Sequence, residues 1–233
     1  MTLSIHDAIL GDLSVRRHPF ARRVSISVAP QGTLVVVAPP RMSVILIRRQ
    51  VVALRAAAQQ LLARHRASIQ YHDGQPIGKR HRIAVVPTRM IDQPSVTVKQ
   101  STIVVYMPPG YQITESSIQS MIRDQVRIVL RTEAKEYLPQ RLASLAECGG
   151  FRYQHVRLQH ASSRWGSCSS RGTISLNIAL MLLSDELIDY VLVHELCHTR
   201  HMNHSPAFWR CVGQYDPRYK HHRTQLRTKT PVI

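Results

Sequence analysis

Two histidines and a glutamate stand at a spacing that suits metal-assisted hydrolysis. His194, Glu195 and His198 form the pattern HExxH. On an α-helix, residues i and i+4 project from one face about one turn apart, so the two imidazoles can hold one zinc ion. Glu195 can reach a water molecule on that ion rather than the ion itself, as a general base. The pattern predicts a zinc-dependent hydrolase, with a peptidase as the leading candidate.

A third ligand is expected, because a catalytic zinc ion is held by three protein ligands and keeps one position open. His204 is the predicted ligand, since Asn203, Ser205 and Pro206 around it favour a turn back toward the end of the helix. His201 is nearer, but on a continued helix it would diverge from the metal. We expect His201 to be solvated or to support a ligand.

The helix that carries HExxH has a clear predicted start. Ser184 is the expected N-cap, and Asp185 and Glu186 place negative charge in the first turn, where the helix dipole favours it. Apolar residues within 187–193 provide the side that faces the core. Phe208, with Trp209 beside it, is expected to pack against this helix.

A strand is expected just before the helix, over 173–179. Its exposed edge could pair with an extended peptide and present a carbonyl group to the metal. Arg164, Trp165 and Asn177 are therefore candidate substrate-binding residues, although a turn with a packed tryptophan would also explain the segment 164–169.

The residue that stabilises the oxyanion is left open between three candidates. They are Arg164, Tyr215 and Tyr219, and each also has a structural explanation. An amidase of the deformylase kind, with Cys168 as a zinc ligand, is an alternative activity. His204 suits the third ligand position better.

Four longer segments around these residues form a more specific pattern. They are RWGSCSSRGTISLN at 164–177, IDYVLVHELCH at 188–198, NHSPAFW at 203–209 and DPRYKHHRTQL at 216–226. With them the chain resembles the YgjP-like metallopeptidases, relatives of the SprT and WLM families in the minigluzincin group. The spacing HExxHxxxxxH also matches the metzincins, but His201 stands where they have a glycine.

The resemblance implies one zinc ion with His194, His198 and His204 as ligands, and Glu195 as the catalytic base. It implies a protein or peptide substrate and a peptidase-like fold with a strand above the active-site helix. The SprT relationship also makes a protease acting on DNA-bound proteins conceivable.

The sequence pattern of the N-terminal half predicts β-hairpins that are each followed by a helix. One hairpin is expected over 24–37 with a helix over 43–66, and a second over 95–106 with a longer helix over 118–145 that Pro139 should kink or split. The two units share a phrase ending in two prolines, which indicates either an old duplication or the recurrence of a common unit. A third unit can be drawn from His155.

We therefore expect an α+β fold in two parts. Residues 1–112 form a β-rich part of hairpin and helix units, and residues 113–233 form the YgjP-like zinc metallopeptidase domain. The first part is expected to pack on a mostly helical, zincin-like catalytic part with a small sheet over the active-site helix.

The charge indicates a partner rather than a reaction. Lys and Arg number 31 against 14 Asp and Glu, a net charge of +17 that attracts polyanions such as nucleic acid. A nucleic-acid-associated protein with structural zinc is thus a second function class, and an evenly basic surface is the simpler explanation. The apolar runs are too short to span a bilayer, and no export signal is recognised, so a soluble, cytoplasmic protein is expected. The four cysteines are expected to be free thiols. The oligomeric state is left open.

Overall fold

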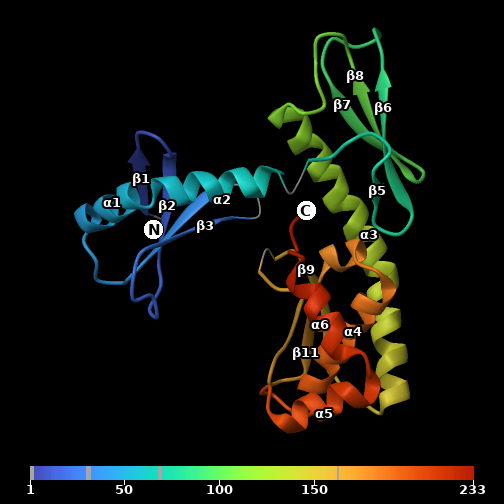
Figure 1. Ribbon diagram of the computed structural model, residues 1–233. Coiled ribbons are helices and arrows are strands. Elements are labelled where there is room, and N and C mark those ends of the chain that lie inside the picture. The colour runs from blue at the N-terminus through green and yellow to red at the C-terminus, as the bar shows by residue number, and fades with distance from the viewer. Residues whose placement is uncertain (1–2, 30–32, 68–69, 162) are drawn as a thin grey trace. The chain divides into compact units, whose positions relative to one another are not determined.

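The computed structural model describes residues 3–29, 33–67, 70–161 and 163–233 and divides the chain into two units, Met1–Gln70 and Tyr71–Ile233. Both units combine small sheets with helices, so the predicted α+β class is confirmed (Figure 1). The division at Gln70 does not coincide with the predicted limit between residues 112 and 113. A catalytic domain that begins at residue 113 stays a prediction.

The first unit is a four-stranded sheet with two helices. Its elements are β1 (Leu3–Asp7), β2 (Gly11–Arg17), β3 (Ser25–Val28), β4 (Leu34–Ala38), α1 (Val44–Ala53) and α2 (Arg55–Ala67). The strand order is β1-β2-β4-β3, and the antiparallel pair β3–β4 confirms the first predicted hairpin. Its expected turn at Gln31 and Gly32 lies outside the described residues. The sequence patterns do not predict β1 and β2.

The helical segment of this unit begins where expected but is not one helix. Ser43 is the N-cap, and its hydroxyl accepts a hydrogen bond from the main-chain N–H of Leu46. The helix is interrupted at Leu54, between α1 and α2. Arg55 then binds the buried Asp7, with Nε 3.1 Å from both carboxylate oxygens. This ion pair ties the break between the helices to the end of β1.

The second unit begins with another four-stranded sheet, which packs on a long helix (Figure 1). The elements are β5 (Pro76–Ile77), β6 (His81–Pro87), β7 (Ser95–Lys99), β8 (Thr102–Met107) and α3 (Ser116–Gly149). The strand order is β5-β6-β8-β7, and the antiparallel pair β7–β8 confirms the second hairpin. α3 contacts this sheet and also the elements that follow it, so it connects the sheet to the helix that carries HExxH.

Pro139 does not split α3. The helix is continuous from Ser116 to Gly149 and ends at Gly150 in the left-handed conformation, with φ 61°. A proline removes one main-chain hydrogen bond and crowds the preceding turn. Leu138 and Leu142 on either side are fully buried. The stabilisation from this packing outweighs the local cost of the proline. Helix propensity alone does not include the packing.

A three-stranded sheet, one 3-10 helix and three α-helices complete the second unit. They are β9 (His155–Gln159), β10 (Gly166–Cys168), β11 (Thr173–Asn177), the 3-10 helix η1 (Ile178–Leu182), α4 (Asp185–His198), α5 (Pro206–Tyr215) and α6 (Tyr219–Arg227). The strand predicted over 173–179 ends at Asn177. β10 is an edge strand of the sheet and contacts α4. The small sheet expected over the active-site helix is thus present.

The same strand topology occurs three times along the chain. In each case the first and third strands are parallel, as in β2–β4, β6–β8 and β9–β11. The second strand pairs antiparallel with the third, as in β3–β4, β7–β8 and β10–β11. The predicted recurrence therefore extends to the third unit, which begins at His155.

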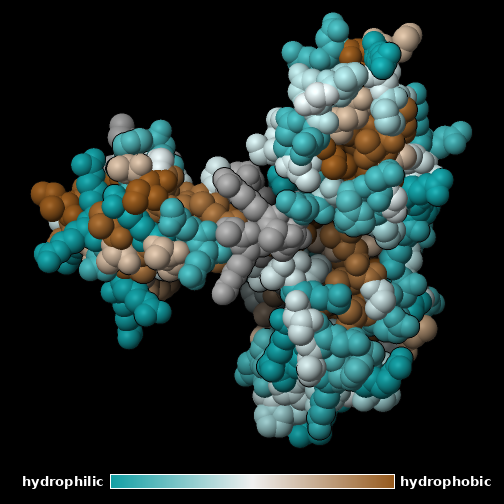
Figure 2. Space-filling view, turned by 45° about the horizontal axis from the view of Figure 1, so that its top comes forward, coloured by the Kyte–Doolittle hydropathy of each residue, from teal (hydrophilic) through white to brown (hydrophobic). Residues whose placement is uncertain are grey.

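Hydrophobic residues gather at several places on the face seen in Figure 2. They lie over the first unit and at separate places on the second. Ile45, Leu46 and Val52 of α1 and Val86 of β6 are among the exposed apolar residues. Of the helices that the structure describes, none is both long enough and apolar enough to cross a membrane.

Candidate metal centre

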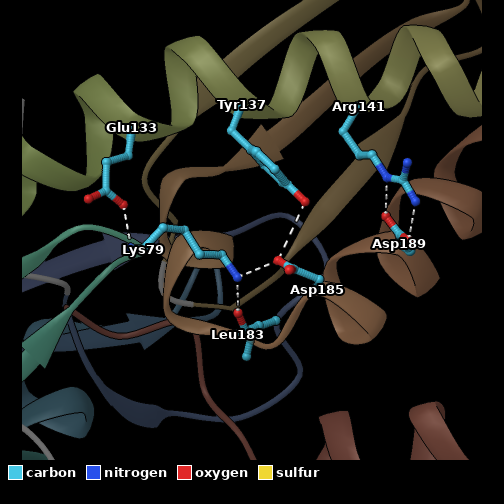
Figure 3. A network of polar contacts seen from close by, with 7 residues as sticks. All are labelled: Lys79, Glu133, Tyr137, Arg141, Leu183, Asp185 and Asp189. Carbon is cyan, nitrogen blue, oxygen red and sulfur yellow. Dashed lines mark hydrogen bonds and ion pairs between the residues drawn. The ribbon is translucent and has the colours of Figure 1, made fainter.

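The helix that carries HExxH is fixed at its beginning by ion pairs to α3 and to the β5–β6 loop (Figure 3). Lys79 donates from Nζ to the carbonyl oxygen of Leu183 at 2.9 Å and to Asp185 Oδ1 at 2.6 Å. The hydrogen bond from Lys79 holds the pKa of Asp185 below its usual value. Arg141 donates two hydrogen bonds to Asp189, at 2.7 and 2.6 Å. These contacts set the start of α4 relative to α3.

A buried carboxylate on α3 positions Lys79 in turn. Glu133 accepts hydrogen bonds from the main-chain N–H groups of Lys79, at 2.7 Å, and Arg80, at 3.1 Å. Its other contact is with His81 Nδ1 at 2.7 Å. The turn passes so close that a Cβ at Gly78 would lie 2.2 Å from the carboxylate, and Gly78 has φ 62°. Glycine at this position lets the loop wrap around Glu133.

α4 begins after Ser184 as predicted, with Ser184 in the extended conformation of an N-cap. Its hydroxyl makes no capping hydrogen bond to the main chain. Asp185 and Glu186 occupy the first turn. Ten residues of the helix are buried, from Leu187 to His198, so its position depends on packing more than on its cap.

The three predicted ligands come together at the end of α4. One nitrogen atom from each of His194, His198 and His204 lies within 4.8 Å of the others. The Nε2 atoms of His194 and His204 are 3.1 Å apart. Two nitrogen ligands of one tetrahedral zinc ion, each about 2.1 Å from it, would be separated by roughly 3.4 Å. The separation in the protein therefore fits a shared ion.

Two aromatic residues of α5 pack against the histidine rings, as predicted. Phe208 is fully buried and stacks on His198, with ring centroids 4.5 Å apart. Trp209 stacks on His204 at 5.6 Å. The hydroxyl of Ser205 caps α5 by accepting from Phe208 N at 3.4 Å. The turn before this short capped helix returns His204 to the end of α4. The stacked Trp209 limits how the His204 ring can rotate.

The Nδ1 atoms of His194 and His198 have different environments. His198 Nδ1 lies 3.1 Å from the carbonyl oxygen of His201. A proton on Nδ1 leaves Nε2 free for a metal. His201 thus positions the predicted ligand His198 through its main chain. His194 Nδ1 is buried and has no hydrogen-bond partner among the residues that the structure describes.

Burial sets the protonation of the site. Desolvation lowers the pKa of His194 to about 3, with smaller contributions from His198 and His204. Desolvation also lowers the pKa of His198. Neutral imidazoles are the form that binds metal. Burial raises the pKa of Glu195 to about 8, and the positive charge of Arg164 opposes that rise.

Glu195 lies directly beneath the edge strand β10. A Cβ placed at Gly166 would be 2.7 Å from Glu195 Oε1, so only glycine fits without a shift. Glu195 Oε2 is buried and lacks a partner within the described part of the chain. A buried carboxylate oxygen without a partner is costly unless another group, such as water, binds there. The Glu195 carboxylate lies between the histidines and the edge of β10, where Oε2 is available to such a group.

The three candidate substrate-binding residues have different surroundings. Trp165 lines a hollow of about 170 Å³ together with residues of α4 and α6, among them His194 and Glu195. Arg164 is exposed. Asn177 is fully buried, and its side chain donates to the carbonyl oxygens of residues 161 and 164, at 2.6 and 2.9 Å. These contacts suit Asn177 to holding the Arg164–Trp165 loop, and direct substrate contact stays a prediction.

The candidates for the oxyanion partner also separate. The Tyr215 hydroxyl donates to Gly149 O at 3.0 Å and is therefore already bound. Tyr219 stacks on Trp209 at 5.6 Å. Arg223 of α6, which the sequence reading did not single out, lies with its guanidinium 4.4 Å from the centre of the Trp209 ring. Its charge also lowers the pKa of His194. The sequence shows that the C-terminal segment is basic, but it does not distinguish Arg223 from the other basic residues there.

Cys168 does not join the group formed by the histidines. Burial raises the pKa of its thiol to about 11, with a further contribution from Glu195. A thiol of high pKa is a poor source of the thiolate that a metal requires. The amidase alternative with Cys168 as a ligand is thus not favoured.

Comparison with known proteins places these features in one family. A model of the "YgjP-like, metallopeptidase domain" matches residues 22–229. Two solved structures are similar to part of the chain. The metallopeptidase zymogen abylysin of Pyrococcus abyssi is 29% identical, with a TM-score of 0.36 and coverage of 39% of this chain and 91% of abylysin. The zymogen jannalysin of Methanocaldococcus jannaschii is 16% identical, with a TM-score of 0.35 and coverage of 39% and 93%.

No curated protein matches the chain. The family match extends over both units and includes the three histidines and Glu195. The protein therefore belongs to the YgjP-like family and is a metallopeptidase.

Proposed function

We propose that this metallopeptidase holds one zinc ion through His194, His198 and His204 and cleaves peptide bonds with Glu195 as general base. The proposal is supported by the convergence of three histidine nitrogen atoms within 4.8 Å beside a buried carboxylate. Three neutral imidazoles suit zinc and leave a fourth position open. Zinc, when bound, polarises a carbonyl group and makes water more acidic.

Glu195 has the surroundings of a proton carrier. Its Oε2 atom is free of other hydrogen bonds within the described residues, and burial favours its protonated form. It can accept a proton from the attacking water and later pass that proton to the leaving amine. The positive charge of Arg164 opposes the effect of burial, which helps Glu195 to ionise before each cycle.

The free edge of β10 is the proposed position of the substrate main chain. Hydrogen bonds of 2.9 Å at Trp165 O and Ser169 N join the two ends of β10 to β11. Because bonded and non-bonded pairs alternate in an antiparallel ladder, the N–H and C=O groups of Gly166 and Cys168 face away from β11. An extended peptide can pair with these groups and pass directly over Glu195.

The side of this peptide that faces α4 meets the hollow lined by Trp165, Tyr190, Val191 and Leu226. Its lining is largely apolar, so we propose that it receives an apolar side chain next to the cleaved bond.

We propose Arg223 as the partner of the oxyanion. Its guanidinium is held against Trp209, whose ring centroid lies 5.9 Å from that of His194. A fixed cation close to the ligands can stabilise charge that develops on the carbonyl oxygen. Replacement of Arg223 by Gln should lower kcat more than it raises KM.

The decisive experiment uses a Glu195→Gln protein with stoichiometric zinc. Loss of a general base lowers turnover by roughly 10²–10⁴-fold. We expect a loss of this size in the cleavage of an unfolded protein substrate, with zinc content unchanged by elemental analysis. Cleavage at the wild-type rate by the zinc-loaded variant would refute the assignment of Glu195.

A nucleic-acid partner is a second proposal, supported by the net charge of +17. The basic segment 79–82 argues against it, because its residues Lys79, Arg80 and His81 bind Asp185, Glu136 and Glu133. Binding of DNA that weakens steeply with salt would support the proposal, and no binding at low salt would exclude it.

A further inference from the structure

The outer face of the β9–β11 sheet carries a positively charged hollow beside the proposed substrate strand. The hollow measures about 470 Å³, and we call it the arginine hollow. It is lined by three arginines and five smaller polar residues: Arg157, Arg164, Arg171, Ser167, Cys168, Ser169, Thr173 and Ser175. No carboxylate is among the described residues that line it. It can therefore bind a negatively charged group.

Strand register places part of this lining in one row. Arg157 of β9 is opposite Ser175 of β11, and Ser175 is opposite Ser167 of β10. Ile174 and Leu176, the neighbours of Ser175 on β11, are fully buried on the other face. Because side chains alternate along a strand, the row from Arg157 to Ser167 lies on the outer face, away from α4. The row ends at the free edge of the sheet.

The three arginines of the hollow differ from other basic residues of the unit in their ion pairs. Arg157, Arg164 and Arg171 are all exposed, and none makes an ion pair with another described residue. Lys79 and Arg141 of the same unit are each paired with an aspartate. Three like charges around one hollow repel one another, and an anion bound between them removes that repulsion.

A peptide paired with the edge of β10 would extend the row by one strand. Its residue opposite Ser167 would direct its side chain to the outer face, next to Ser167 and the arginine hollow. The residues before and after it would direct their side chains toward α4. Guanidinium groups bind carboxylates through paired, charge-assisted hydrogen bonds, and the serine and threonine hydroxyls can donate further ones.

We infer that the arginine hollow selects substrates with an aspartate or glutamate at the residue opposite Ser167. The inference rests on the proposed function, because it assumes that the substrate pairs with β10. It adds a specificity: an acidic side chain on the outer face, with the peptide bond cut at a fixed distance along the strand. Arg157 and Arg171 are specificity residues in this arrangement, and they contact the side chain rather than the reacting atoms.

The test measures peptide affinity and cleavage separately. Peptides of one sequence carry Glu, Gln or Lys at each position in turn. Their affinity is measured by fluorescence anisotropy with zinc-loaded Glu195→Gln protein, and kcat/KM is measured with wild type. A charge-assisted hydrogen bond contributes about 1.5–3 kcal/mol, which corresponds to roughly tenfold or more in affinity. We expect Glu to exceed Gln by about this factor at one position, and Lys to be the weakest there.

The variants distinguish an effect of the arginine hollow from an effect of the protein's overall positive charge. In the Arg157→Gln/Arg171→Gln protein, the ratio between the Glu and Gln peptides should fall toward one. Arg89→Gln is the matched control, because Arg89 is exposed in the loop between β6 and β7 and its replacement removes the same charge. Thermal melting of each variant checks that it folds. An equal fall of the ratio in Arg89→Gln, or an unchanged ratio in the double variant, would overturn the inference.

The remaining outcomes distinguish the inference from the proposed function. Equal affinity for Glu and Gln peptides at every position would overturn the inference alone, whether or not wild type cleaves them. Full activity of Glu195→Gln would overturn the proposed function, while a Glu preference in affinity would still support the hollow. A single-stranded oligonucleotide that binds through Arg157 and Arg171, with no acidic preference among peptides, would assign the hollow to nucleic acid instead.

Discussion

At the scale of single residues, Glu195 combines a charged group with a buried position. Its pKa in the folded, metal-free protein is about 8, against 4.5 for an unperturbed glutamate. Burial is the main cause, because it disfavours the ionised form. The protein keeps this carboxylate beside the three histidines, at a cost in stability that should depend on pH.

We predict that the metal-free protein loses stability as pH rises from about 4.5 to about 8. In this window the unfolded chain releases the Glu195 proton more readily than the folded one, so unfolding becomes more favourable. Glu195→Gln has no such proton. Its advantage in free energy of unfolding over wild type should therefore grow with pH across this range. Urea denaturation of both metal-free proteins at pH 5, 6, 7 and 8 measures it, and a constant difference would contradict the prediction.

Gly166 gives a second prediction at this scale. Gly166→Ala would place its Cβ 2.7 Å from Glu195 Oε1 and must displace the carboxylate or the strand. A shift of about 1 Å in a catalytic group can reduce the rate by roughly 100-fold. We expect a loss of kcat of about that size with normal zinc content, because the three histidines are not touched.

Ser163→Ala is the control for Gly166→Ala, since Ser163 is exposed three residues earlier. Peptide cleavage and elemental analysis measure the two effects. A Gly166→Ala protein with full activity would show that β10 is not held against Glu195.

At the scale of elements, α4 is placed by ion pairs and by packing. Arg141 and Asp189 connect α3 to α4 through two hydrogen bonds (Figure 3). Their side chains are 39% and 28% exposed, so solvent screens part of the attraction. Asp189→Asn should lower the free energy of unfolding by about 1 kcal/mol.

Asp124→Asn is the matched control for this prediction. Asp124 pairs with Arg127 at 3.2 Å on the same helix, and no ion pair among the described residues joins Asp124 to another element. Urea denaturation should show a smaller loss for Asp124→Asn than for Asp189→Asn. Equal losses would mean that the pair between α3 and α4 has no special part in placing the active-site helix.

The recurring strand topology places one strand of each unit at the edge of a sheet. These strands are β3, β7 and β10, and each pairs antiparallel with its neighbour. In the third sheet, Gly166 of β10 lies over a glutamate, and the outer face carries the arginine hollow. The same simple unit thus serves as scaffold in two places and as the proposed substrate strand in the third.

At the scale of the whole molecule, the two compact units make the extent of the catalytic part testable. The histidines, Glu195 and the arginine hollow all belong to residues 71–233. A fragment of these residues should fold and bind zinc. A fragment of residues 113–233 lacks Lys79 and leaves the buried Glu133 without three of its contacts, and it should fold poorly.

Circular dichroism melting and zinc stoichiometry of the two fragments measure this prediction. The full chain is the reference for both. A stable fragment 113–233 with one zinc ion would support a domain limit at residue 112 and would show that the β5–β8 sheet is dispensable.

The sequence by itself determined the features that depend on local spacing. HExxH on a helix that begins after Ser184, the return of His204 after a short turn, and the hairpins β3–β4 and β7–β8 all follow from periodicity, capping and turn residues. These signals act within a few residues, so a single sequence contains them. They were enough to predict that the three histidines come together and to predict the class of the fold.

Only the tertiary structure decided what depends on distant partners. The parallel pairing of β9 with β11, the position of Gly166 over Glu195 and the continuity of α3 through Pro139 come from packing between elements far apart in the sequence. Long-range pairing also gathers Arg157, Arg164 and Arg171 around one hollow. Desolvation and register arise when these surfaces meet, and local sequence patterns do not record them.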